Sequence, residues 1–506
     1  MMKSINRATK LALNTSLSLC LQFTTIICGF ILPRLILISY GSSVNGLVNS
    51  ISQFLGIVSL LDLGVGAVVQ STLYTPLADK DYDSISKIYK SASRFFRKIA
   101  FILLIYVTAL LFIYPHFVKE NFSGVFTITL IVAICISSFA QYYFGVVNSL
   151  LLAADQKGYI TYFTQIITLI INTAVCAILI KTGCSIQVVK LTTSLIFLMR
   201  PIVYNAYVNH NYKIDKKVIL DTEPIKQKWN GMAQHFASYL ILGTDNIILT
   251  LFSSLSNVSI YSVYYLVIGG VNNIFYSITN GFQSLMGDML AKKETDKLYS
   301  FFSSMEWMFH TSITLIFGCT SVLVLPFVQV YTAKVNDANY YQPIFAVVIS
   351  IAYAAHCMRL PYHVLIKAAG HYRETQMSYI VSTILNIVIS ITTVKIFGLI
   401  GVSLGTLIAM LYQTIWMAWY DSKHIINWPF KNFLKQLAID ILTILIGSLA
   451  TFKIPLLSIS YYSWVVQAIE VFCVWCIIVL IINLLFYRDK LIMVFDKVVK
   501  RIKRGR

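Results

Sequence analysis

The chain has 506 residues, of which 57% are hydrophobic and only 12% are charged, and its mean hydropathy is +0.73. Soluble globular proteins are about one-quarter charged, so this composition excludes a soluble globular fold and predicts a protein whose solvent is lipid. The formal net charge of +19 does not indicate a nucleic-acid partner, because an excess of Lys and Arg marks the cytoplasmic side of a membrane protein.

Apolar runs that can cross a bilayer as helices follow one another along the chain. A helical span takes about 20 apolar residues. The candidate spans are 13–39, 44–72, 99–118, 125–153, 159–181, 185–208, 230–254, 258–287, 304–330, 341–366, 374–395, 399–420, 434–454 and 462–486. A short uncharged link, Tyr40–Ser43, separates the first two runs. The sequence therefore predicts an all-α polytopic membrane protein with about fourteen transmembrane helices.

The distribution of positive charge predicts the orientation of these spans. With a cytoplasmic N-terminus, the inner segments carry 31 Lys and Arg residues, including six in the basic segment at 80–98. The outer segments carry 6: Lys119, Lys181, Lys190, Lys334, Lys395 and Lys453. The remaining three, Arg34, Arg200 and Arg359, lie within spans. Because basic residues concentrate on the cytoplasmic side, both termini are expected to be cytoplasmic.

The first six spans recur as spans seven to twelve. Ala153–Ala154 corresponds to Ala368–Ala369 at an offset of 215 residues, and Asn172 corresponds to Asn386 at one residue less. The offset contains an even number of spans, so both halves have the same orientation. This pattern predicts two parallel six-helix bundles related by a pseudo-two-fold axis along the membrane normal.

The predicted organisation has four parts. An N-terminal six-helix bundle covers 1–212, and a second bundle that repeats it covers 213–430. An extra helix pair occupies 431–487, and a basic cytoplasmic tail follows at 488–506. The tail has apolar residues at helical spacing, so it is expected to be either an amphipathic helix on anionic membrane lipids or a solvated segment.

Three arginines lie within spans, where a charge is costly unless it faces a cavity or a partner. Arg34 follows Pro33 in the outer half of the first span. It is expected either to bind an anionic head group or to form an ion pair with Asp62 of the next span. Arg200 and Arg359 lie in inner halves, and each is expected to face a cavity or to extend toward the cytoplasm.

Further polar residues belong to the predicted substrate site. His356 lies one turn before Arg359. The span at 258–287 carries Asn280 and Gln283, and an apolar helix needs such a polar face only where it lines water or a polar solute. We therefore expect these side chains to contact the substrate.

Two carboxylates, Asp62 and Asp245, also lie within spans. Each is predicted either to carry a coupling H⁺ or Na⁺, because either ion can neutralise a carboxylate, or to be the counter-ion of a buried Arg. Glu306 and His310 lie four residues apart near the inner end of the ninth span, and they are interpreted as an interfacial pair.

The sequence does not indicate an enzyme. It has no P-loop for ATP and no zinc-ligand spacing. The segments outside the spans do not exceed about 30 residues, which is too short for a catalytic domain. Neither a cofactor nor a resident metal is therefore expected.

Three stretches carry a resemblance to a known family. They are PRLILISYGSSVNGLVNSISQFLGIVSLLDLGVGAVVQSTLYTPLA, NGFQSLMGDMLAKKE and RLPYHVLIKAAGHYRETQ. They resemble bacterial polysaccharide (O-antigen/capsule) repeat-unit flippases of the multidrug/oligosaccharidyl-lipid/polysaccharide exporter superfamily. The resemblance covers essentially the whole chain, and the helix plan is similar to that of the lipid II flippase.

This resemblance implies a function and a location. A cavity lined by cations would take the pyrophosphate and sugars of an undecaprenyl-linked oligosaccharide. Alternating access would move this head group to the outer leaflet while the lipid tail stays in the bilayer, and Arg34 would contact the head group. The implied location is the bacterial cytoplasmic membrane, where a repeat-unit polymerase and glycosyltransferases are implied partners.

Two other functions remain open. An ion-coupled multidrug or small-molecule antiporter of the same superfamily would need a cavity dominated by carboxylates, whereas the three arginines within spans outnumber Asp62 and Asp245. A non-transporting scaffold of an envelope assembly complex would make no use of polar residues in its spans. The arginines favour an anionic substrate.

Overall fold

The computed structural model describes residues 7–58, 65–118, 121–215, 217–220, 243–426 and 428–493. Within these ranges all the regular secondary structure is helical. Twelve helices found there are long and apolar enough to cross a membrane. The predicted all-α polytopic membrane fold is therefore confirmed. Most of the predicted span at 230–254, Asp62 and residues 494–506 of the tail lie outside the described residues.

The chain divides into two compact units. Unit 1 contains the described residues within 1–239 together with Ser254–Ser259. Unit 2 contains the described residues within 240–253 and those from Ile260 onward. The predicted domain boundaries after residues 212, 430 and 487 stay predictions.

The helices of unit 1 include one with an internal break. They are α1 (Arg7–Gly56), α2 (Val65–Asp79), α3 (Tyr82–Val118), α4 (Gly124–Ala140), the π-helix η2 (Gln141–Gly145), α5 (Val146–Ala154), α6 (Gly158–Lys181) and α7 (Ile186–Asn211). In α1, Gly41 has φ 86° and ψ 171°, a conformation that glycine adopts at little cost. The break lies within the predicted link Tyr40–Ser43, so α1 supplies the first predicted span and the start of the second.

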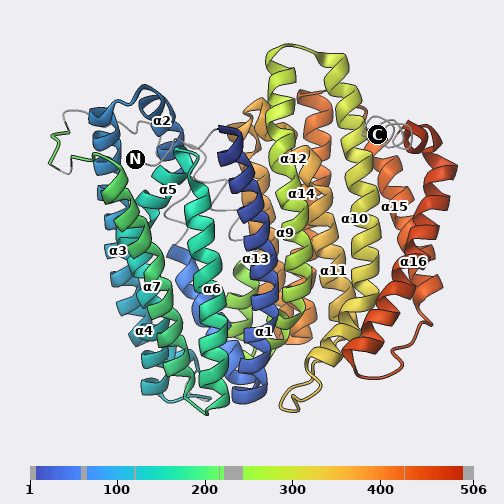
Figure 1. Ribbon diagram of the computed structural model, residues 1–506. Helices are drawn as coiled ribbons and strands as arrows, with labels where there is room; N and C mark the ends of the chain where they lie inside the picture. Colours follow the sequence, from blue (N-terminus) through green and yellow to red (C-terminus); the bar gives the residue numbers. More distant parts are fainter. Residues whose placement is uncertain are drawn as a thin grey trace. The chain divides into compact units, whose positions relative to one another are not determined.

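The first part of α1 lies along α6, and contacts near both ends of α6 hold it there (Figure 1). Lys10 Nζ donates a hydrogen bond to the carbonyl oxygen of Asp155 at 3.2 Å, just before α6 begins. Tyr40 Oη donates to the carbonyl oxygen of Cys184 at 2.5 Å, just after α6 ends. These contacts determine the position of the helix that carries Arg34.

Helix α3 begins at Tyr82, well before the predicted span at 99–118. The added part is the basic segment that the charge count assigned to an inner loop. Its buried positions recur at helical spacing: Ile85, Ile88, Ala92 and Phe96. The segment is therefore an amphipathic extension of the helix, because one face packs inward while the basic side chains lie on the other.

In unit 2 a helix covers 243–252, and α9 belongs to this unit from Ile260 onward. The other helices are α9 (Leu255–Ala291), α10 (Thr295–Tyr331), α11 (Pro343–Met358), α12 (Leu360–Ala369), α13 (Tyr372–Phe397), α14 (Leu399–His424), α15 (Phe430–Thr451) and α16 (Tyr461–Phe486). Helices α13 and α14 approach closely at Gly401 and Gly405, two small residues four positions apart. A Cβ atom on Gly405 would lie 2.9 Å from the carbonyl oxygen of Asn386.

The C-terminal pair, α15 and α16, lies beside α10 (Figure 1), and one indole ring fills the space where the three helices meet. Trp475 of α16 is fully buried. A Cβ atom on Gly318 of α10 would lie 2.2 Å from this ring, and one on Gly447 of α15 would lie 2.6 Å from it. The ring therefore occupies space that only glycine leaves open on both neighbouring helices.

The fourth helix of each predicted repeat is interrupted at a matching place. In the first half, η2 separates α4 from α5. In the second half, Arg359 separates α11 from α12. The offset of 215 residues places Arg359 opposite Phe144, inside η2. Helices α3 and α10, each 37 residues long, also correspond. These matches support the predicted repeat, and interruptions of this kind are frequent at functional sites.

We expect Gly405→Ala to lower the stability of the protein by about 1–3 kcal/mol, because the added methyl group would clash with the α13 backbone. The apparent Tm of the purified protein in detergent would measure this. Gly270→Ala in α9 is the matched control, since its Cβ atom would meet nothing within 4 Å. A Gly405→Ala protein that melts at or above the temperature of the Gly270→Ala protein would contradict the close packing of α13 and α14.

Candidate functional site

Asp245 lies in the helix at 243–252 and is 1% exposed. Its Oδ2 atom accepts hydrogen bonds from Tyr261 Oη of α9 at 2.7 Å and from Thr406 Oγ1 of α14 at 2.8 Å. Its Oδ1 atom has no hydrogen-bond partner among the described residues. In the same part of the chain no Lys or Arg forms an ion pair with Asp245. The carboxylate therefore has one oxygen available for a ligand and no described cationic partner.

Two further side chains complete an oxygen-rich group around Asp245. Thr244 Oγ1 donates to Asn386 Oδ1 at 2.8 Å, and Asn386 Nδ2 donates to Thr406 Oγ1 at 3.0 Å. Asn386 and Thr406 come together because α13 and α14 pack closely at Gly405. A buried carboxylate surrounded by hydroxyl and amide oxygens can hold a proton or a hard cation such as Na⁺.

A polar cavity of about 310 Å³ lies within unit 1, between α1, α4 and α7. Hydroxyl groups line much of its wall, those of Ser52, Ser137, Ser138, Tyr142, Thr193 and Ser194. Lys190 adds a positive charge to this wall. Such a cavity suits a ligand that carries negative charge and many hydroxyl groups.

Arg200 lies on the same face of α7 as the cavity wall. Lys190, Thr193, Phe197 and Arg200 are three or four residues apart, which places them on one face of a helix. Arg200 Nε donates to Thr168 Oγ1 of α6 at 2.8 Å, and the guanidinium carbon lies 3.9 Å from the centre of the Phe197 ring. The charge count assigned Lys190 to an outer segment. Its position on the face of Arg200 is the signal that would have identified it.

Arg34 is half-buried on the first part of α1, before the break at Gly41. The predicted partner, Asp62, lies outside the described residues. Whether Arg34 pairs with Asp62 or binds an anionic head group therefore stays a prediction.

Arg359 and His356 are each 2% exposed and lie at the interruption between α11 and α12. Arg359 Nη1 donates to Gln413 Oε1 of α14, and the guanidinium carbon lies 5.9 Å from the centre of the Tyr379 ring. The ring of His356 stacks on that of Tyr276, with 5.9 Å between the ring centres. Both side chains are therefore enclosed by α9, α13 and α14 and do not extend into water.

Several polar atoms of this group have no hydrogen-bond partner among the described residues. They are Arg359 Nε, Gln413 Nε2 and both ring nitrogens of His356. Buried polar groups in proteins are normally hydrogen-bonded. Each of these atoms could therefore bind water or a polar ligand.

The two predicted polar residues of α9 are only partly described. Gln283 is half-buried, and the side chain of Asn280 lies outside the described residues. Two to three turns earlier on α9, Asn272 Oδ1 accepts a hydrogen bond from Cys357 Sγ at 3.4 Å. This contact joins α9 to the helix that carries His356.

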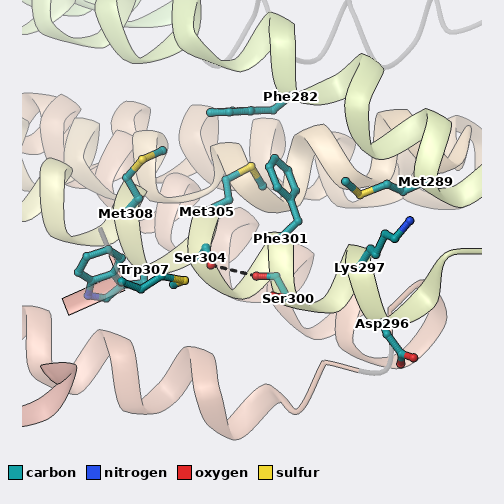
Figure 2. A pocket seen from close by; sticks show the side chains of 11 residues that line it. Phe282, Met289, Asp296, Lys297, Ser300, Phe301, Ser304, Met305, Trp307 and Met308 are labelled. Atoms are coloured by element: carbon teal, nitrogen blue, oxygen red, sulfur yellow. Dashed lines mark hydrogen bonds between the residues drawn. The ribbon is translucent and has the colours of Figure 1, made fainter. Parts of the chain in front are cut away.

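A second cavity, of about 710 Å³, lies in unit 2 and is mostly apolar. Methionine and aromatic side chains line it: Phe282, Met289, Phe301, Met305, Trp307, Met308 and Met493. Figure 2 shows Phe282 of α9 facing Phe301 and Met305 of α10, with Asp296 and Lys297 at one end of the cavity. Flexible methionines adapt to irregular apolar ligands, so this cavity suits an apolar chain.

The interpretation of Glu306 and His310 as an interfacial pair is wrong. Glu306 is 3% exposed and His310 is 0% exposed. Trp428 Nε1 donates to Glu306 Oε1 at 3.2 Å, and Asp440 Oδ2 lies 2.6 Å from His310 Nδ1. Helix α15, which carries Asp440, and the segment before it therefore cover the face of α10 that the sequence analysis placed at the membrane surface.

The predicted site residues belong to both units. Arg34 and Arg200 lie in unit 1, whereas Asp245, His356 and Arg359 lie in unit 2. Within unit 2 the structure brings His356 and Arg359 together. That Arg34, Arg200 and Arg359 line one substrate cavity stays a prediction.

Solved structures share this fold. The chain is similar to the lipid II flippase MurJ in its inward closed conformation, with a TM-score of 0.69 and 13% identity over 94% of this chain and 99% of that chain. It is also similar to a multidrug resistance MATE family transporter of the MOP superfamily in an inward-facing conformation, with a TM-score of 0.57 and 13% identity over 79% of this chain and 94% of that chain. The Vibrio cholerae MATE transporter VcmN in its bent form matches with a TM-score of 0.54 and 13% identity over 86% of this chain and 99% of that chain. No family model and no curated protein sequence matches. The chain therefore has the fold of these transporters.

We expect the Tm of the purified wild-type protein to rise when Na⁺ replaces choline at constant ionic strength, or when protons are added at constant salt. Either cation would neutralise Asp245 and so stabilise the folded state. The variant Asp245→Asn should lose the response to Na⁺ and show a smaller response to protons. The control is Asp288→Asn, which removes an exposed carboxylate paired with Lys292. A full response in Asp245→Asn, or none in the wild type, would contradict a cation site at Asp245.

Proposed function

We propose that the chain is a flippase that moves undecaprenyl-pyrophosphate-linked oligosaccharide repeat units from the cytoplasmic to the outer leaflet by alternating access. The observation that carries this proposal is the cationic, hydroxyl-lined cavity of unit 1, in a chain with the fold of a lipid II flippase. Lys190 and Arg200 lie on one face of α7, where they provide positive charge for a pyrophosphate.

The physical need for such a cavity follows from the substrate. A pyrophosphate and several sugars would lose their hydration in hydrocarbon, which is prohibitively costly without replacement contacts. The ammonium of Lys190 and the guanidinium groups of Arg200 and Arg34 would replace water around the phosphates. The surrounding hydroxyl groups would do the same for the sugars.

The apolar part of the substrate has a counterpart in unit 2. The cavity lined by methionine and aromatic side chains is large enough for a segment of a polyprenyl chain. The likeness to the lipid II flippase covers 94% of this chain, against 79% and 86% for the two MATE transporters. An additional helix pair such as α15 and α16 would produce this difference, which favours a lipid-linked substrate.

Transport in one direction needs a source of free energy. We infer that a gradient of H⁺ or Na⁺ supplies it and that Asp245 couples this gradient to transport by binding the cation. A cation shifts the equilibrium between the inward-facing and outward-facing conformations only if it binds one of them more tightly than the other. Asp245 supports such a role, because its side chain is buried in this structure and its Oδ1 atom has no hydrogen-bond partner among the described residues. A cation would therefore bind more tightly to this conformation than to one in which the carboxylate is exposed to water.

A second candidate function is ion-coupled antiport of multidrug or small-molecule substrates. The likeness to MATE transporters and the Asp245 site favour it. Lys190 in the wall of the unit 1 cavity and Arg200 on the same face of α7 argue against it, since they would repel a cationic drug. Efflux of a cationic dye from vesicles that survives Lys190→Ala would support this second function.

The remaining features of the proposal concern the setting. The chain would lie in the bacterial cytoplasmic membrane with both termini cytoplasmic and would receive its substrate from glycosyltransferases. It would pass the substrate to a repeat-unit polymerase on the outer side. Its two bundles would cover 1–212 and 213–430, followed by a helix pair at 431–487 and a basic tail.

We expect Arg34→Ala and Lys190→Ala each to reduce translocation of a labelled undecaprenyl-pyrophosphate oligosaccharide in proteoliposomes by about tenfold or more. A hydrogen bond to a charged group contributes about 1.5–3 kcal/mol, which corresponds to this loss. The control is Lys181→Ala, which removes an exposed lysine at the end of α6.

Normal Tm values for these variants would separate a transport defect from misfolding. Undiminished translocation by Lys190→Ala at wild-type protein levels would contradict the assignment of the unit 1 cavity to the head group. Equal losses in Lys181→Ala would do so as well, because they would reflect a general effect of charge.

A further inference from the structure

A chain of buried hydrogen bonds joins α10, α12 and α15 in unit 2. Asp440 Oδ2 lies 2.6 Å from His310 Nδ1, and His310 Nε2 lies 3.3 Å from Tyr362 Oη. Tyr362 Oη lies 2.7 Å from Glu306 Oε1, which also accepts a hydrogen bond from Trp428 Nε1. The hydrogen bonds thus run without a gap from Asp440 to Glu306. The α10–α15 network comprises Glu306, His310, Tyr362 and Asp440.

The same atoms allow two arrangements of one proton. If Tyr362 donates to Glu306, its oxygen must accept from His310 Nε2–H, while Nδ1–H donates to Asp440. The imidazole then carries both protons and Glu306 is ionised. If instead Glu306 is protonated, it donates to Tyr362, and Tyr362 donates to Nε2 of a neutral His310.

Conversion between the two arrangements transfers one proton along the network. The O–H bond of Glu306 breaks and a bond from Nε2 of His310 to hydrogen forms. Tyr362 gives one proton to the histidine and receives one from the glutamate, so its own charge does not change. The heavy atoms need not move for this transfer, because the distances already suit hydrogen bonding in both directions.

Asp421, in the last turns of α14, adds a carboxylate without a partner. It is 1% exposed, and neither of its oxygens has a hydrogen-bond partner among the described residues. It lies close enough to Glu306 and Tyr362 for their charges to interact. Two neighbouring buried carboxylates are costly when both are ionised, so Asp421 and Glu306 together favour uptake of a proton.

Cations on the surrounding elements do not balance these acids. Helices α10, α12, α14 and α15 contribute the titratable groups Glu306, His310, Tyr362, Asp421 and Asp440. Lys490, which follows α16, is half-buried, and its Nζ donates to the carbonyl oxygen of Ser303 at 2.8 Å. Lys435 of α15 is exposed, with its Nζ 5.4 Å from the centre of the Tyr487 ring. The buried groups thus place two carboxylates, those of Asp440 and Glu306, near one imidazole, and a third, that of Asp421, near Glu306.

We propose that the α10–α15 network, together with Asp421, is a proton-binding site separate from that of Asp245. Adjacent nitrogen and oxygen atoms of the network lie 2.6–3.3 Å apart, the spacing at which a proton is shared between them, so the cation that fits this geometry is a proton. Bound there, the proton offsets one of the buried negative charges and is shared between Glu306 and His310 through Tyr362.

The site lies where a proton can influence the helices. Tyr362 belongs to α12, which starts directly after the interruption at Arg359. Asp440 belongs to α15, in the C-terminal pair. The protonation state of the network therefore determines the strength of the hydrogen bonds that join α10 to Tyr362 of α12 and to Asp440 of α15. Use of this proton in a transport cycle rests on the proposed function, whereas proton binding itself does not.

Proton uptake by the purified full-length chain tests the site directly. A pH-indicator dye in weakly buffered detergent solution would report the protons bound between about pH 8 and about pH 5.5, a range in which exposed carboxylates stay ionised. We expect the wild type to bind about one proton more per chain than the double variant Glu306→Gln/Asp421→Asn. The control Glu374→Gln, which removes an exposed carboxylate of the same unit, should match the wild type.

Trp428 provides a second readout that leaves the network intact. Its indole N–H is bonded to Glu306, so the fluorescence of the wild type should change over the same pH range. Trp428→Phe should lose that component. This measurement keeps the test valid even where the double variant does not fold.

The outcomes separate the proton site from the proposed function. Equal proton uptake by the wild type and a folded double variant would overturn the site, as would wild-type fluorescence with no Trp428 component that depends on pH. Release of the extra proton by Na⁺ in an Asp245→Asn background would assign a metal cation to the network and would also overturn it. A protein that shows the extra proton but does not translocate the lipid-linked oligosaccharide would leave the site in place and refute the flippase.

Discussion

A polar or charged side chain within an apolar helix bundle must find its partners inside the bundle, because no water is available to hydrate it. Where the partners are complete, the group fixes neighbouring helices, as Tyr114 Oη does when it donates to Ser50 Oγ at 2.6 Å. Where they are incomplete, as at Asp245 Oδ1, the ring nitrogens of His356 and both oxygens of Asp421, something else must complete them. This constraint separates structural polar groups from candidate binding groups.

Two local features decide where the incomplete groups lie. Close packing at Gly405 brings Asn386 of α13 next to Thr406 of α14 and so builds the surroundings of the buried carboxylate at Asp245. The regular α-helical pattern of the fourth helix of each repeat is interrupted at η2 and at Arg359, while the backbone stays right-handed and helical at both places. The sites therefore depend on backbone geometry as much as on the charged side chains themselves.

The helical fold and the positions of most helices along the chain could be predicted from the sequence. A helix forms all its backbone hydrogen bonds internally, and it is one of the few structures that can cross a bilayer. The break at Gly41 was also predictable, since it lies between two apolar runs. Glu306 and His310 could not be placed, because hydropathy does not tell which face of a span a neighbour covers, and α15 lies outside the repeat that guided the topology. Lys190 was missed because it lies near the end of a span, where a charged residue is easily assigned to a loop. Its position on the same face of α7 as Arg200 is what identifies it.

The two units differ in the balance of positive and negative charge at their sites, although Arg359 of unit 2 is also buried. The cavity wall of unit 1 and the adjoining face of α7 carry Lys190 and Arg200. The described sites of unit 2 bury four acids, Asp245, Glu306, Asp421 and Asp440. Under the proposed function, unit 1 would take the anionic head group while unit 2 would take cations. Ligands held in separate units can influence each other only through a conformational change that both bias. The interrupted fourth helices, one in each unit, are the elements best placed to take part in it.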